Sequence, residues 1–138
     1  MYTIGSSYAF SSVVLHAVCR GQYLFACAWL LLTVTSVVHH TRTFRGQSVD
    51  WTFLADQLAL YLAVTVGGSL IFRHMEHTSC FLLGVMFTTV TFCVILYFWG
   101  QRTNRFCFDA CPAKANYWHL TMHCSSMIGH HAILLAIP

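Results

Sequence analysis

The sequence predicts an all-α fold, a multi-pass transmembrane helix bundle of about five spans, and three observations support this prediction. Only 8% of the 138 residues are charged and 57% are hydrophobic, whereas about 25% of the residues of a soluble domain are charged. The apolar residues form five stretches, each near the ~20 residues that a helix needs to cross a bilayer. Most charged residues fall between these stretches. Four acidic and seven basic side chains are too few to cover a soluble protein of this size, so lipid is the expected outer solvent.

The predicted spans follow one another with short connections. They cover residues 2–18, 23–39, 51–72, 80–99 and 117–137. The first span is the least apolar because it contains the run Gly5-Ser6-Ser7. Gly100 and Pro112 mark the last connection as a loop. The chain is therefore expected to form one bundle over residues 1–138, without a separate soluble domain.

Charge in the loops predicts the orientation, since five spans place the two termini on opposite sides. The loops 41–50 and 100–116 hold five cationic residues, against two on the other side: Arg42, Arg45, Arg102, Arg105 and Lys114 against Arg20 and Arg73. The positive-inside rule places those two loops in the cytosol. Two cysteines of the longer loop, Cys107 and Cys111, could pair in an oxidising lumen or remain free thiols. We expect no nucleic-acid partner.

Ionisable residues inside the spans point to a functional site, because such groups are costly in lipid and face the bundle interior. Asp56 is the one acidic residue within a span. His119 and His123 are four residues apart, so they project from one helix face and could bind a single zinc ion, as two histidines do in the helical H-E-x-x-H motif. His130 lies on the same face two turns further on, where we expect it to form a hydrogen bond inside the bundle or to meet His16.

A second pair with the same spacing ends the second span. Ser36 and His40 are also four residues apart, and Asp56 lies at a similar depth in the third span. In an up-and-down bundle these residues converge with His119 and His123 on one side of the membrane. Three neutral imidazoles with one open position describe a catalytic zinc site. Asp56 would then accept a hydrogen bond from the zinc-bound water or orient a ligand histidine, and Ser36 would hydrogen-bond the water or a substrate carbonyl.

At these residues the sequence resembles the CREST superfamily of membrane hydrolases, whose members include alkaline ceramidases, progestin and adipoQ receptors, GPI-remodelling hydrolases and myomaker. The shared motifs are Ser-x-x-x-His ending the second helix, an Asp early in the third, and His-x-x-x-His in the last. The resemblance implies His40, His119 and His123 as zinc ligands and Ser36 and Asp56 as supporting catalytic groups. Members have seven transmembrane helices, so this chain resembles a shortened member that lacks a pair before the last helix.

Three functions are compatible with these patterns. The first is a zinc-dependent membrane hydrolase that cleaves a lipid amide or ester, with a membrane lipid as substrate or ligand. The second is a non-catalytic zinc-stabilised membrane protein, such as a receptor-like module, a fusogen or an assembly subunit. In that case a second copy or a partner subunit could complete the bundle. The third is a b-type haem protein with axial histidines from the second and fifth spans, which would leave Ser36 and Asp56 without a role.

Overall fold

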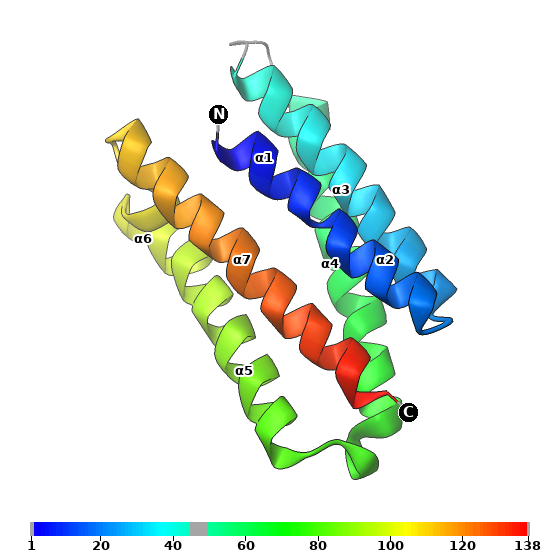
Figure 1. Ribbon diagram of the computed structural model, residues 1–138. Helices are drawn as coiled ribbons and strands as arrows, with labels where there is room; N and C mark the ends of the chain where they lie inside the picture. Colours follow the sequence, from blue (N-terminus) through cyan, green and yellow to red (C-terminus); the bar gives the residue numbers. More distant parts are fainter. Residues whose placement is uncertain (1, 45–49, 138) are drawn as a thin grey trace.

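The computed structural model describes residues 2–44 and 50–137, and this part of the chain is built from helices (Figure 1). The helices are α1 (Tyr2–Ala9), α2 (Ser11–Cys19), α3 (Tyr23–Phe44), α4 (Asp50–His74), α5 (Cys80–Val94), α6 (Gly100–Thr103) and α7 (Pro112–Ala136). Short 3-10 turns occur at Met75–His77 (η1) and Phe106–Phe108 (η3), and a π-helical turn at Ile95–Trp99 (η2). The predicted all-α class is confirmed.

The chain runs up and down through the bundle. As a result, the end of α3, the beginning of α4 and the beginning of α7 lie at the same end, near the N-terminus (Figure 1). The C-terminus lies at the opposite end, beside the connection from α4 to α5. This arrangement brings the two motif-bearing helices, α3 and α7, into position for a shared site.

Among the described residues, three helices are long and apolar enough to cross a membrane. They are Tyr23–Thr43, Trp51–His77 and Cys80–Phe108, and they correspond to the second, third and fourth predicted spans. The apolar helix Ile4–Cys19 is shorter, and α7 has 25 residues but carries four histidines. Membrane crossing by these two outer segments, and with it the count of five spans, stays a prediction.

The first predicted span is helical but interrupted at Phe10. The Ser11 hydroxyl donates a hydrogen bond of 2.6 Å to the carbonyl of Tyr8, and serine side chains that bond back to the preceding turn compete with the regular helix pattern. Phe10 keeps right-handed helical backbone angles, φ −58° and ψ −24°. The segment therefore continues in nearly the same direction as two short helices.

Helix α3 continues past the predicted boundary at residue 39 and ends at Phe44. Neither glycine nor proline occurs between residues 40 and 45 to stop it, and the Thr43 hydroxyl donates to the carbonyl of His39 at 3.0 Å. His40 consequently lies a full turn inside the helix, where the backbone fixes the direction of its side chain. Arg45, which contributed to the charge comparison, lies outside the described residues.

Helix α7 is the central element of the bundle and packs against α1, α2, α4 and α5. Pro112 occupies its first turn, where a missing backbone N–H costs nothing. Because other helices surround α7, its inner face is buried, and both His123 and His130 lie on the buried part. The position of α7 explains how a helix with four histidines can belong to a chain this apolar.

Close packing of α7 against α5 depends on Gly129. A Cβ atom at this position would collide with the hydroxyl of Thr89 on α5, whereas a Cβ on Gly68 of α4 would meet nothing within 4 Å. We expect Gly129→Ala to destabilise the folded protein by about 1–3 kcal/mol, the usual cost of overpacking. Gly68→Ala is the matched control and should leave stability unchanged or raise it by up to about 1 kcal/mol through helix propensity. Thermal denaturation in detergent measures both variants, and equal midpoints would contradict the predicted contact.

A polar cluster of Ser12, His16 and His131 joins α2 to α7 at the end away from the N-terminus. His16 and His131 form a hydrogen bond of 2.8 Å between their Nδ1 atoms, and Ser12 bonds to Nε2 of His131 at 3.2 Å. His130 instead forms a hydrogen bond of 2.8 Å with the carbonyl of Ser126. The expected internal hydrogen bond of His130 is therefore present, but the neighbouring histidine is the one that meets His16.

The cysteine thiols are free, and all of these residues lie in the described part of the chain. Cys107 is partly buried in η3 and Cys111 is exposed just before α7. The pairing that the sequence left open is thus not formed in this structure.

Candidate metal centre

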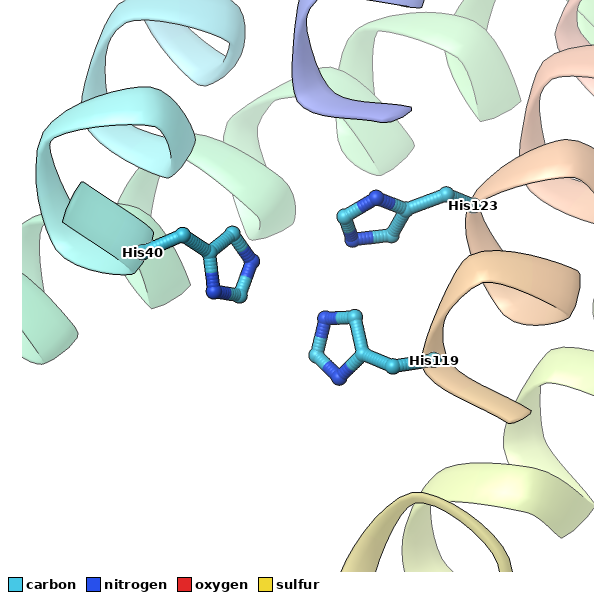
Figure 2. Close-up of side chains that lie close together, drawn as sticks. All are labelled: His40, His119 and His123. Carbon is cyan, nitrogen blue, oxygen red and sulfur yellow. The ribbon is translucent and has the colours of Figure 1, made fainter. Parts of the chain in front are cut away.

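Three histidines meet at the end of the bundle where α3 ends and α7 begins (Figure 2). They are His40, His119 and His123. Each offers one ring nitrogen as a potential ligand, and these three nitrogens lie within 4.8 Å of one another. The ring centroids are 4.9 Å apart for His40 and His119, 4.6 Å for His119 and His123, and 5.7 Å for His40 and His123. The structure therefore brings together the three residues that the sequence proposed as metal ligands.

Helix geometry accounts for this convergence. His119 and His123 are one turn apart on α7, so their rings project from the same face. His40 approaches from α3 on the opposite side of the gap (Figure 2). Helix α1 packs against both α3 and α7, and its ribbon passes beside the cluster (Figure 2). Three helices thus hold the site, although only two of them supply imidazoles.

Burial and unmet hydrogen bonding suit the cluster to a cation. His40 is 9% exposed and His123 is 6% exposed. Nε2 of His40 is buried and has no hydrogen-bond partner within the described residues. An unpartnered buried polar atom costs about 1–3 kcal/mol, and coordination of a metal ion would remove this cost. His119 is more accessible than the other two, which leaves one side of the cluster open.

The nitrogen spacing is wider than in an occupied zinc site. Zinc–nitrogen bonds of about 2.0–2.1 Å in tetrahedral geometry place ligand nitrogens roughly 3.4 Å apart, compared with the limit of 4.8 Å here. Rotation of the imidazole rings would bring the nitrogens closer together. The three residues could therefore hold a metal ion.

The two supporting residues lie close to each other, where α3 packs against α4. Ser36 is 2% exposed and precedes His40 by one turn of α3. The Asp56 carboxylate accepts a hydrogen bond of 3.4 Å from Thr35, and the Ser36 hydroxyl is its second hydrogen-bonding neighbour. Asp56 therefore bonds to α3 hydroxyls and not to a ligand histidine. Its expected contact with a zinc-bound water stays a prediction.

Helix α1 contributes residues that the sequence argument did not single out. Ser6 lies 2.8 Å from Nδ1 of His123, and Ser7 lies 2.9 Å from the hydroxyl of Ser36. The ring of Phe10 packs 4.7 Å from that of His123. The signal available in the sequence was the polar run Gly5-Ser6-Ser7 inside an otherwise apolar span. Two adjacent hydroxyls in such a span need polar partners, and His123 and Ser36 provide them.

A further polar link lies on the α4–α5 side of Asp56. The hydroxyl of Tyr97 donates to Oε1 of Gln57 at 3.2 Å, and Gln57 directly follows Asp56 on α4. Tyr97 belongs to the π-helical turn η2, and such turns are frequent at functional sites. This hydrogen bond joins α4 to the end of the α5 segment near the candidate centre.

Comparison with known proteins adds no assignment, since no protein-family model, curated protein or solved structure matches this chain.

Proposed function

We propose that this chain is a zinc-dependent integral membrane hydrolase of the CREST type, which crosses the bilayer about five times and cleaves a lipid amide or ester. The observation that supports the proposal most directly is the cluster of His40, His119 and His123, which could hold a metal ion and in which Nε2 of His40 is buried without a partner. Ser36, one turn before His40 on α3, and Asp56, which neighbours Ser36, would supply the hydroxyl and the carboxylate that hydrolysis requires.

The donor set favours a transition-metal ion such as zinc over calcium and magnesium. Three imidazoles without a carboxylate or a thiolate in direct contact suit zinc and resemble the three-histidine catalytic site of carbonic anhydrase. Calcium and magnesium prefer oxygen ligands, so the cluster disfavours both. A three-histidine site also leaves a fourth position free for a reactant.

The chain's own residues have separable roles in this proposal. When bound, the ion supplies Lewis-acid chemistry, which polarises an acyl carbonyl and acidifies water. His40, His119 and His123 hold it in place. The carboxylate of Asp56 takes the proton of the attacking water and later delivers it to the leaving amine or alcohol, as a general base and acid. Thr35 orients that carboxylate. The Ser36 hydroxyl has a single proton, which it donates to Asp56 in the free protein and to the substrate carbonyl in the complex.

The apolar outer faces of α3 and α4 support a lipid substrate. The outer faces of α3 and α4 are apolar and exposed, with Leu30, Val34, Leu58 and Leu62 among the exposed side chains. A substrate acyl chain can remain in the bilayer beside these faces while its head group reaches the cluster at the end of the bundle. The site lies on the side of loops 41–50 and 100–116, which the charge distribution predicts to be cytosolic.

Release of free fatty acid tests the catalytic proposal. Purified, zinc-loaded protein is incubated with a panel of ceramides and glycerophospholipids, and the expected result is release of fatty acid from at least one class. His119→Ala should abolish this release, while His77→Ala, which removes an exposed histidine of η1, should not affect it. A zinc-loaded protein that leaves every amide and ester of the panel intact would refute the hydrolase.

A non-catalytic, zinc-stabilised membrane protein is the second candidate, and the exposure of α5 favours it. The Cys80–Phe108 span is the least buried of the three candidate spans. It carries a shallow groove of about 410 Å³ lined by Cys80, Phe81, Gly84, Val85, Thr88 and Thr89. Small residues four apart allow close helix approach in membranes, so a second copy or a partner subunit would complete the bundle here. Zinc uptake combined with stable association and no lipid cleavage would select this candidate.

The haem alternative fits this arrangement less well. Two axial histidines must face each other across a porphyrin, but the ring of His123 lies 4.6 Å from that of His119 and 5.7 Å from that of His40. The third imidazole therefore occupies space that the macrocycle would need. Purified protein without a Soret absorption band is the expected result.

A further inference from the structure

Helix α1 reaches the candidate metal centre through two neighbouring serines. The Ser6 hydroxyl lies 2.8 Å from Nδ1 of His123, and the Ser7 hydroxyl lies 2.9 Å from that of Ser36. Both serines are buried, at 5% and 0% exposure. Adjacent residues on one short helix thus contact a ligand on α7 and a supporting residue on α3.

The two ring nitrogens of His123 face different surroundings. In Figure 2 one nitrogen faces the ribbon of α1, and the other faces the gap that it shares with His40 and His119. The hydrogen bond to Ser6 identifies the nitrogen beside α1 as Nδ1, so the nitrogen directed at the gap is Nε2. A metal ion in the cluster would be bound by His123 through Nε2.

The protonation of Nδ1 determines whether Nε2 can bind a metal. A neutral imidazole carries one N–H, and the other nitrogen holds the lone pair that a metal needs. Metal-binding histidines usually donate their free N–H to an acceptor, which fixes the tautomer and the ring orientation. A serine hydroxyl has two acceptor lone pairs. In the buried setting of His123, the Ser6 oxygen can accept the Nδ1–H and leave the Nε2 lone pair directed at the gap.

We infer that Ser6 is a positioning residue that holds His123 in the Nδ1–H tautomer and so prepares its Nε2 for metal binding. The inference rests on the proposed metal function. It extends that function to α1, a segment outside the family motifs, and makes docking of this helix part of the metal centre. Ser7 fastens the same helix to Ser36, whose hydrogen-bonding neighbour is Asp56.

Nitrogen-15 NMR of the histidine rings tests the inference in metal-free protein, with the His123 signals assigned by their loss in His123→Gln. Wild type should show His123 in the Nδ1–H tautomer. Ser6→Ala should shift it to a mixture or to the Nε2–H tautomer, and Ser6→Thr, which restores a hydroxyl, should return it to Nδ1–H. Ser11→Ala is the control, because it removes a serine hydroxyl that bonds to the Tyr8 carbonyl of its own helix segment, and it should leave the tautomer unchanged.

Zinc affinity, measured by competition with a chelator, supplies the second readout. Loss of an outer hydrogen bond to a metal ligand typically weakens binding by about 10–100-fold, so we expect this loss in Ser6→Ala and recovery to within a few-fold in Ser6→Thr. A wild-type His123 in the Nε2–H tautomer, or a tautomer and affinity unchanged in Ser6→Ala, would overturn the inference. If wild type binds no zinc, the proposed function fails, whereas the NMR experiment still decides the role of Ser6.

Discussion

Replacement of His123 by alanine should abolish zinc binding by the purified protein. Wild type is expected to hold about one zinc ion per chain, and His123→Ala close to none after the same purification. His123 is the most deeply buried member of the cluster, and with two imidazoles left the site cannot hold the ion against solvent. The loss should exceed the roughly 10–100-fold effect of an outer hydrogen bond. Inductively coupled plasma mass spectrometry measures the metal content directly.

His130→Ala provides a matched control for this experiment. His130 lies on the same helix and is buried to a similar extent, 8% exposed against 6% for His123, but its ring packs against Phe25 and Trp29 instead of the cluster. His130→Ala should therefore keep its zinc even if it loses stability. Because an ion bound to the folded state stabilises it by mass action, a chelator should lower the melting temperature of wild type and of His130→Ala, but not that of His123→Ala. Equal zinc content in both variants would refute the assigned site.

The convergence of His40, His119 and His123 could be predicted because helical periodicity and membrane physics constrain it strongly. The four-residue spacing of His119 and His123 fixes a shared face, and the cost of polar groups in lipid requires that this face be turned inward. The up-and-down order then places His40 at the same depth. Short connections leave little freedom to separate α3 from α7, so local patterns were sufficient to bring together residues about 80 positions apart in the chain.

The contacts of α1 and of the His16–His131 pair depend on details that the spacing of residues in the sequence does not contain. Adjacent residues on a helix differ in direction by about 100°, so the rotation of α7 decides whether His130 or His131 faces His16, and only packing sets that rotation. Likewise, Ser6 and His123 are 117 residues apart, and no periodicity relates them. The π-helical turn that carries Tyr97 contains no glycine or proline from which it could be predicted. These features arise from how side chains fit between helices.

The other large effect is expected at Asp56, where Asp56→Asn should reduce lipid hydrolysis while leaving zinc in place. The amide keeps the size of the side chain and can still accept the hydrogen bond from Thr35, but it cannot take a proton from water. General acid–base groups contribute typically 10²–10⁴-fold to rate, so a fall of about that size is expected in fatty-acid release.

Because the hydrogen bonds of Asp56 go to hydroxyls and not to a ligand histidine, the zinc content of Asp56→Asn should match that of wild type. Asp109→Asn is the control, since the carboxylate of Asp109 accepts a hydrogen bond from the backbone N–H of Cys111, and it should keep full activity. Undiminished hydrolysis in Asp56→Asn would remove Asp56 from the chemistry, whereas joint loss of zinc and activity would show that the carboxylate holds the metal centre together instead of moving a proton.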